Sequence, residues 1–238
     1  MRVLDLFSGI GGFSLGLERA GMKTVAFCEI EDYPSRVLAK HWPKVPIYHD
    51  IRKLTAETLR RDGITVDVIC SGFPCQDIAR GGKGAGITGE KSGLWTEYAR
   101  LIDELRPRFV IVENSTFLRS RGIDRVLGDL AEVGYDAEWH CIPASYVGAP
   151  HKRDRIWIVS YPHASHADRR SGIVQMGWVR IEKEIEDNGY SPGVQWRAKP
   201  GMGIVAHGVS DRLGKLCALG NAVVPQIPEI IGRAIMAA

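Results

Sequence analysis

Short apolar runs alternate with segments of helical periodicity over the first 160 residues of the chain. This alternation is typical of a doubly wound α/β sheet, because each strand is followed by a helix that packs back onto the sheet. In such a sheet, ligands bind beyond the carboxyl ends of the strands. The predicted strands are Val3–Phe7, Thr24–Glu29, Val66–Ser71, Phe109–Glu113 and Ile156–Tyr161, with His140–Pro143 as a further candidate; the predicted helices are Phe13–Ala20, Ser35–His41, Ala56–Arg61, Trp95–Leu105 and Arg125–Val133.

The pattern changes after residue 160. From Pro162 to about Gly208 the chain is rich in glycine, histidine and charge, and it has no sustained period. These features predict a small, irregular inserted module rather than another strand–helix unit. Ordered structure is expected again from Ser210, with a final helix over Pro225–Met236.

Composition limits the class of protein. The chain has 238 residues, of which 45% are hydrophobic and 25% charged, so it predicts one large globular domain or one domain plus a small one. A net charge of +3 is compatible with a polyanionic partner without requiring one. Five cysteines without CxxC spacing favour reduced thiols over disulfides or zinc. His163, His166 and Asp168 are interpreted as a polar loop, so no metal site is expected.

The N-terminal residues and the length of the apolar stretches predict the location of the protein. The first residues do not form a signal peptide, and no apolar stretch is long enough to span a bilayer. We therefore expect a cytoplasmic protein that does not contact a membrane.

A glycine-rich turn, Asp5–Gly12, follows the first predicted strand and opens the first helix. Glycines let the backbone approach a ligand, and helix N–H groups face it; a turn that only reverses the chain is the alternative. Glu29 ends the second strand, where an acid can accept hydrogen bonds from ribose hydroxyls. Ser14 occupies the third glycine position of the dinucleotide fingerprint, which favours a nucleoside cofactor without phosphates. Asp50, beyond the third strand, is placed either to meet an adenine amino group or to be an ordinary solvated aspartate.

A cysteine follows another predicted strand, in Gly72-Phe73-Pro74-Cys75-Gln76. A thiol at the carboxyl end of a strand, after a proline that stiffens the turn, is a candidate nucleophile, although many cysteines at such positions are inert. Glu113 should emerge near Cys75, where a carboxyl in a partly apolar pocket can be protonated and can donate to a ring nitrogen. A helix-capping acid is the alternative for Glu113.

A run of charged residues, His151–Arg155, precedes the strand over Ile156–Tyr161. In an extended chain, Arg153 and Arg155 point to one side, and Lys152 and Asp154 point to the other. A solvated charged surface is the alternative interpretation.

Together these segments resemble the C5-cytosine DNA methyltransferase family. The matching segments, in the family's order, are Asp5–Gly12, Gly72–Gln76, Glu113-Asn114, Arg153-x-Arg155 and Gly220–Pro225. The resemblance covers nearly the whole chain except the insert. It implies a Rossmann-like, mostly parallel α/β sheet of the class I S-adenosylmethionine-dependent methyltransferases. It also implies a discontinuous catalytic domain, residues 1–160 plus 209–238, and an unusually short target-recognition module, residues 161–208.

The resemblance implies a mechanism. Cys75 attacks C6 of a cytosine, Glu113 holds N3 and the exocyclic amine, Arg155 contacts the O2 side, and Arg153 supports the catalytic carboxylate. The methyl group passes from S-adenosylmethionine to C5 of a cytosine flipped out of duplex DNA. By the same resemblance, the cofactor-binding residues are Phe7, Ser8, Gly9, Gly11, Gly12, Glu29, Ile30, Asp50, Ile51, Pro74, Leu94, Asn221 and Val223. The glycine-rich segment Asp77–Gly93 is expected to close over the flipped base, and DNA contacts are expected from Gln76, Arg80, Lys83, Lys91 and Asn114.

Three departures from the family pattern leave alternatives open. His151 stands where the family usually has Gln, Ser115 replaces the common Val, and the insert is short. The alternatives are an RNA cytosine-C5 methyltransferase and a degenerate member that binds S-adenosylmethionine or DNA without catalysis. An NAD oxidoreductase fits worst. We expect a monomer that acts on duplex DNA, with a cognate restriction endonuclease as a further candidate partner.

Overall fold

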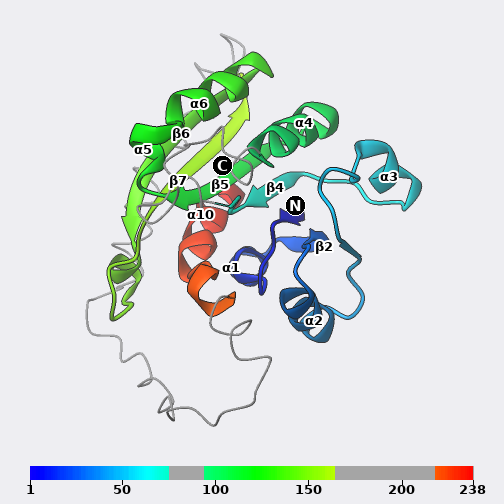
Figure 1. The fold of residues 1–238 in the computed structure, drawn as a ribbon, viewed down its shortest axis with the longest axis horizontal. Coiled ribbons are helices and arrows are strands. Elements are labelled where there is room, and N and C mark those ends of the chain that lie inside the picture. Colours follow the sequence, from blue (N-terminus) through cyan, green and yellow to red (C-terminus); the bar gives the residue numbers. More distant parts are fainter. Residues whose placement is uncertain (75–93, 164–217, 238) are drawn as a thin grey trace.

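The computed structural model describes residues 1–74, 94–163 and 218–237, which form one sheet flanked by helices (Figure 1). Within these ranges the sheet has seven strands in the order β3-β2-β1-β4-β5-β7-β6. The pairs from β3 to β5 are parallel, whereas β7 is antiparallel to both of its neighbours. The predicted α/β class and mostly parallel sheet are confirmed. The strands are β1 (Arg2–Leu6), β2 (Lys23–Cys28), β3 (Ile47–Tyr48), β4 (Val68–Ser71), β5 (Phe109–Ser115), β6 (Tyr135–Pro143) and β7 (Asp154–Pro162).

Helices cover both faces of the sheet, as the doubly wound pattern predicts (Figure 1). Successive side chains of a strand point to opposite faces. Accordingly, Ile69 packs in the cluster under α4 and α6, and Val68 packs in the cluster under α1 and α10. The helices are α1 (Gly12–Arg19), α2 (Asp32–His41), α3 (Ala56–Arg61), α4 (Trp95–Leu105), α5 (Leu118–Arg121), α6 (Ile123–Glu132) and α10 (Gln226–Met236), and a 3₁₀ helix, η3, spans Ala144–Val147. No helix in this part of the chain is long and apolar enough to cross a membrane.

Several element boundaries differ from the prediction. β6 begins at Tyr135 rather than His140, because an edge strand with half-exposed residues shows no continuous apolar run. The two-residue β3 is too short to give a period, and the four-residue α5 was also missed. α2 begins at Asp32, since its proline at position 34 is tolerated in a first turn. β7 continues to Pro162, which pairs with Tyr135 in the sheet.

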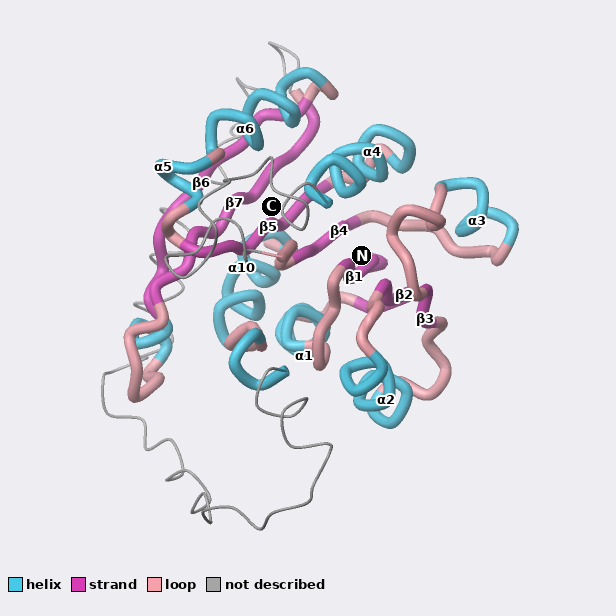
Figure 2. Tube along the Cα trace, viewed as in Figure 1, coloured by secondary structure: helices cyan, strands magenta, loops and turns pink. Residues whose placement is uncertain are grey.

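Helices from the two ends of the chain, α1 and α10, pack side by side (Figure 2). Glycines permit the close approach. A Cβ on Gly16 would clash with the carbonyl oxygen of Pro225, and a Cβ on Gly232 would lie 2.7 Å from Cβ of Ala20. The backbones therefore come closer than larger residues would allow, and this contact brings the segment before α10 to the first helix.

Asp5 is a fully buried carboxyl in β1. Its Oδ2 accepts a hydrogen bond from Ser14 Oγ at 2.7 Å. Among the described residues no nitrogen or oxygen donor reaches Oδ1, and the register partner of Asp5 in β4 is Cys70. Burial raises the pKa of Asp5 from 3.8 to about 7, and the hydrogen bond from Ser14 opposes this only in part. The core of the sheet thus holds a carboxyl that favours its neutral form.

We predict that Gly16→Ala destabilises the protein by about 1–3 kcal/mol, because the added methyl group forces α1 and α10 apart. Gly128→Ala is the matched control. Gly128 is also inside a helix, but a Cβ there meets nothing within 4 Å. Alanine should therefore stabilise that position by about 0.5–1 kcal/mol. Urea unfolding measures both; equal effects of the two substitutions would contradict the close packing.

We predict that Asp5 makes stability fall as the pH rises from about 4 to about 7. Over this window the unfolded carboxyl has lost its proton while the folded one retains it, which is worth about 4 kcal/mol in total. Asp5→Asn should remove this dependence, so that the stability of the variant relative to the wild type increases toward pH 8. Asp124→Asn, at an exposed position of α6, controls for the loss of an ordinary carboxyl. Parallel stability curves for wild type and Asp5→Asn would refute the assignment.

Candidate active site

The turn after β1 holds three residues in the left-handed backbone region. Phe7 has φ 49°, Gly9 has φ 53° and Gly11 has φ 84°. A non-glycine residue in this region is strained, and such strain is common at ligand sites. Gly11 also has no room for a side chain, because a Cβ there would lie 2.6 Å from the ring of Trp42. The glycine-rich turn over Asp5–Gly12 is therefore a fixed turn beyond the carboxyl end of β1.

Glu29 follows β2 and directs its carboxylate at this turn. Its Oε2 accepts the backbone N–H of Gly9 at 2.7 Å, and its Oε1 accepts the N–H of Glu31 at 2.8 Å. Burial raises the pKa of Glu29, and the two N–H donors oppose that effect. Each carboxylate oxygen can accept a further hydrogen bond, so Glu29 is oriented by the turn and can still receive ribose hydroxyls.

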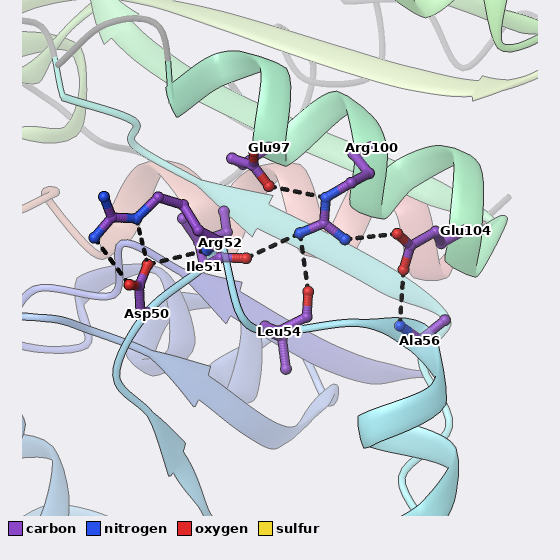
Figure 3. A network of polar contacts seen from close by, with 8 residues as sticks. All are labelled: Asp50, Ile51, Arg52, Leu54, Ala56, Glu97, Arg100 and Glu104. Carbon is purple, nitrogen blue, oxygen red and sulfur yellow. Dashed lines mark hydrogen bonds and ion pairs between the residues drawn. The ribbon is translucent and has the colours of Figure 1, made fainter. Parts of the chain in front are cut away.

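Asp50 lies in the loop that follows β3 (Figure 3). Its Oδ1 accepts hydrogen bonds from the backbone N–H of Arg52 at 3.0 Å and from Nε of the same residue at 2.9 Å. Its Oδ2 accepts a hydrogen bond from Nη2 of Arg52 at 2.9 Å. Hydrogen bonding to the Arg52 guanidinium holds the pKa of Asp50 below its usual range. Asp50 is therefore an oriented anion rather than a freely rotating surface carboxylate.

Apolar side chains accompany these two carboxylates. Ile51 is buried in the core cluster beneath α4, and Phe7 and Leu94 pack against the same cluster. Ile30, next to Glu29, is 59% exposed. Hydroxyl and amino donors suit two carboxylates, whereas phosphates would be repelled by them. This part of the site therefore fits a nucleoside cofactor without phosphates.

Glu113 lies near the carboxyl end of β5 and is only 8% exposed. Its Oε1 forms an ion pair with Nε of Arg155 at 2.8 Å. Burial raises the pKa of Glu113, and the charges of Arg155 and Arg153 oppose the rise. The other oxygen, Oε2, lies 2.9 Å from the position that a Cβ on Gly72 would take. Glycine at position 72 therefore makes room for the Glu113 carboxyl beside the Pro-Cys motif.

Asn114 connects the Glu-Asn motif to the Pro-Cys motif. Its Nδ2 donates to the carbonyl oxygen of Phe73 at 3.0 Å, and its Oδ1 accepts the N–H of Ser115 at 2.8 Å. The side chain is buried, with both polar groups paired. Asn114 holds the chain leading to Pro74 against β5, and its contact with DNA stays a prediction.

Arg153 departs from the extended geometry that period two predicts. Its φ is +37°, and β7 begins only at Asp154. Its Nη1 donates to the carbonyl oxygen of Gly220 at 2.7 Å, and its Nη2 donates to that of Ala222 at 2.9 Å. The direct ion pair with Glu113 belongs to Arg155, while Arg153 holds the segment before α10. Within that segment, the carbonyl of Val223 approaches Gly12 so closely that a Cβ there would lie 2.6 Å away.

The described ranges contain part of the predicted site. They include Glu113, both arginines and the predicted cofactor-binding residues. The ranges contain no cluster of three or more His, Cys, Asp or Glu side chains that could hold a metal. The predicted nucleophile and loop residues Cys75, Gln76, Arg80, Lys83 and Lys91 lie outside the described residues, as do His166 and Asp168.

Sequence reasoning missed the residues that position others. Ser14 was considered only as a missing glycine, although its hydroxyl is the hydrogen-bond donor to Asp5. Arg100 in α4 carried no motif, yet it contacts the loop of Asp50 (Figure 3). A polar residue within an apolar helical period is a weak signal for either role.

Comparison with known proteins identifies the family. The family model described as C-5 cytosine-specific DNA methylase matches residues 1–191. Type II methyltransferase M2.BsuMI of Bacillus subtilis (strain 168) is 33% identical over 168 residues, covering 67% of this chain and 42% of the relative. Type II methyltransferase M.CviJI of Paramecium bursaria Chlorella virus IL3A is 35% identical over 156 residues, covering 65% of this chain and 41% of the relative. The chain thus spans less than half the length of these relatives.

Solved structures agree with the fold. A prophage-encoded protein of Escherichia coli aligns with a TM-score of 0.61 and 26% identity, covering 76% of this chain and 50% of that one. The S. pombe Dnmt2 methyltransferase aligns with a TM-score of 0.57 and 19% identity, covering 77% and 60%, which supports the fold alone. From the family match over residues 1–191, together with the Glu113–Arg155 site, the chain belongs to the C-5 cytosine-specific DNA methylase family.

Proposed function

We propose that this chain transfers a methyl group from S-adenosylmethionine to C5 of a cytosine flipped out of duplex DNA. The observation that carries the proposal is the buried Glu113, pinned by Arg155 and facing Gly72 at the entrance to the Pro-Cys motif. A duplex cytosine is inaccessible in the base stack, so the base must leave the helix to reach such a buried group.

Glu113 suits the Watson–Crick edge of cytosine. Burial raises the pKa of Glu113, so the carboxyl can take up a proton and donate it to ring N3, while its second oxygen accepts from the exocyclic amine. Arg155 fixes the carboxyl through Oε1. As negative charge develops in the ring, a donor already in place at N3 stabilises it without reorganisation.

Cys75 supplies the nucleophile in this proposal. Its thiolate forms a bond to C6, and the electrons of the C5–C6 double bond shift toward C5, with Glu113 donating at N3. S-adenosylmethionine, when bound, supplies the methyl group that C5 accepts. A base then removes the C5 proton, the double bond re-forms, and the thiolate of Cys75 leaves C6. The enzyme returns to its starting state.

The cofactor position follows from the two carboxylates. Glu29 would accept the ribose hydroxyls, and Asp50 would accept the adenine amine. Val223 would close the site from the segment that Arg153 holds. The backbone turn over Phe7–Gly12, fixed by its left-handed residues, would receive the remainder of the cofactor.

The proposal also covers the recognition module, the partners and the location of the protein. Residues 161–208 would form the target-recognition module, and basic residues of the insert would contact phosphates. The relatives are named Type II methyltransferases, which supports a cognate restriction endonuclease for this chain. We propose a monomeric enzyme of the bacterial cytoplasm or of a phage-infected cell.

The test is methyl transfer from labelled S-adenosylmethionine to mixed genomic duplex DNA, to the same DNA single-stranded, and to tRNA. We predict label at C5 of cytosine in the duplex only. Cys75→Ser should abolish transfer, and Glu113→Gln should reduce it by about 10²–10³-fold, because the N3 donor is lost.

Glu132→Gln, at the exposed end of α6, is the control for Glu113→Gln and should transfer normally. Label in tRNA alone would replace the proposal with an RNA methyltransferase. Cofactor binding without transfer to any of the three substrates would instead indicate a degenerate member of the family.

A further inference from the structure

The loop of residues 50–54, which we call the cofactor loop, contains almost no regular structure of its own. Two of its side chains, Ile51 and Leu54, are buried in the core. The backbone N–H of Leu54 donates to the carbonyl oxygens of Asp50 and Ile51. Buried backbone carbonyls need hydrogen-bond donors. The carbonyl of Ile51 accepts the N–H of Leu54 within the loop, at 3.3 Å, and the carbonyls of Ile51 and Leu54 both accept a shorter bond from a helix side chain.

That donor is Arg100, from the middle of α4 (Figure 3). Its Nη2 donates to the carbonyl oxygens of Ile51 and Leu54, both at 2.9 Å. Its Nε donates to Glu97 at 2.8 Å, and its Nη1 donates to Glu104 at 2.6 Å. The two glutamates precede and follow Arg100 by about one helical turn, so they fix the guanidinium in the direction of the loop.

Glu104 extends the same network beyond the cofactor loop. One of its oxygens accepts from Arg100, and the other accepts the N–H of Ala56 at 2.9 Å. Ala56 is the first residue of α3, where backbone N–H groups lack partners within the helix. The network therefore fixes the loop itself through Arg100, and it fixes the start of α3, just after the loop, through Glu104.

Within the loop, Asp50 is already oriented by Arg52. The position of the Asp50 carboxylate then depends on where the loop backbone lies, and that depends on Arg100. α4 also starts directly after residues 75–93, which contain Cys75. One helix therefore serves as the support for the cofactor loop and as the continuation of the segment that carries the nucleophile.

We propose that Arg100 is a positioning residue for the cofactor. It holds the cofactor loop on α4, so that Asp50 and Ile51 meet the adenosine part of the cofactor in one geometry. This inference rests on the proposed function. It predicts a defect in cofactor binding that is separate from the chemical step, because the contacts of Arg100 among the described residues go to the loop and to two glutamates of α4, and not to Glu113.

The experiment compares wild type with Arg100→Met, which keeps the aliphatic stem and removes the donors. We expect the Kd for S-adenosylmethionine, measured by calorimetry, to rise about tenfold, since oriented polar contacts fail when their supporting loop shifts. The kcat at saturating cofactor and the Kd for duplex DNA should stay within about twofold of wild type.

Two variants separate loop positioning from helix stability. Asp103→Asn removes the ion pair of Asp103 with Arg106 at the end of α4 but leaves the contacts of Arg100 with the loop and with both glutamates. Arg125→Met removes the ion pair of Arg125 with Asp129 in α6, a comparable i,i+4 pair away from the loop. Both should bind the cofactor like wild type. Should Arg100→Met fail to fold, Arg100→Lys replaces it with the same expectation, because one ammonium cannot span both carbonyls and both glutamates.

Three outcomes would contradict the inference. Unchanged cofactor affinity in Arg100→Met or Arg100→Lys, beside a wild type that binds, would overturn it alone. An equal loss in Asp103→Asn would assign the effect to the stability of α4. A wild-type chain that does not bind S-adenosylmethionine would overturn the proposed function, and this inference with it.

Discussion

A carboxylate buried at the edge of a sheet is costly unless a cation compensates it. Glu113 meets this requirement through Arg155, which the antiparallel pairing of β5 with β7 brings to it. Removing the guanidinium would leave the carboxyl buried without its charge partner, and removing the carboxyl would leave Arg155 without its own. The reversal of strand direction after five parallel strands therefore has a chemical consequence. It delivers an arginine to the end of the sheet where ligands bind.

The two ends of the chain depend on a second set of contacts. Gly16 and Gly232 allow α10 to lie against α1, and Arg153 donates to two carbonyls of the segment before α10. As a result Val223 reaches Gly12, beside the turn that would receive the cofactor. Arg153 thus joins the start of β7 to the segment before α10. It does so from a left-handed backbone conformation, just before the strand begins.

Strand ends were the most predictable part of the site. Glu29 and Glu113 lie where apolar runs stop, and in a parallel sheet those positions share the carboxyl ends of the strands. The contacts that orient them were not predictable. Glu29 accepts the backbone N–H of Gly9, 20 residues earlier, and Arg100 donates to carbonyls 46 and 49 residues away. Such bonds depend on tertiary distances that no local period encodes, and β3 is too short to carry a period.

The central claim is that this site attacks a cytosine ring through Cys75 while Glu113 holds its far edge. The most direct measurement uses duplex DNA in which every cytosine carries fluorine at C5, incubated with S-adenosylmethionine and the chain. Fluorine cannot leave as a proton does, so the thiolate cannot be released after methyl transfer. The account predicts a covalent protein–DNA complex that survives denaturing electrophoresis and is absent with Cys75→Ser. Failure to form it, in a sample that methylates ordinary duplex DNA, would contradict the account.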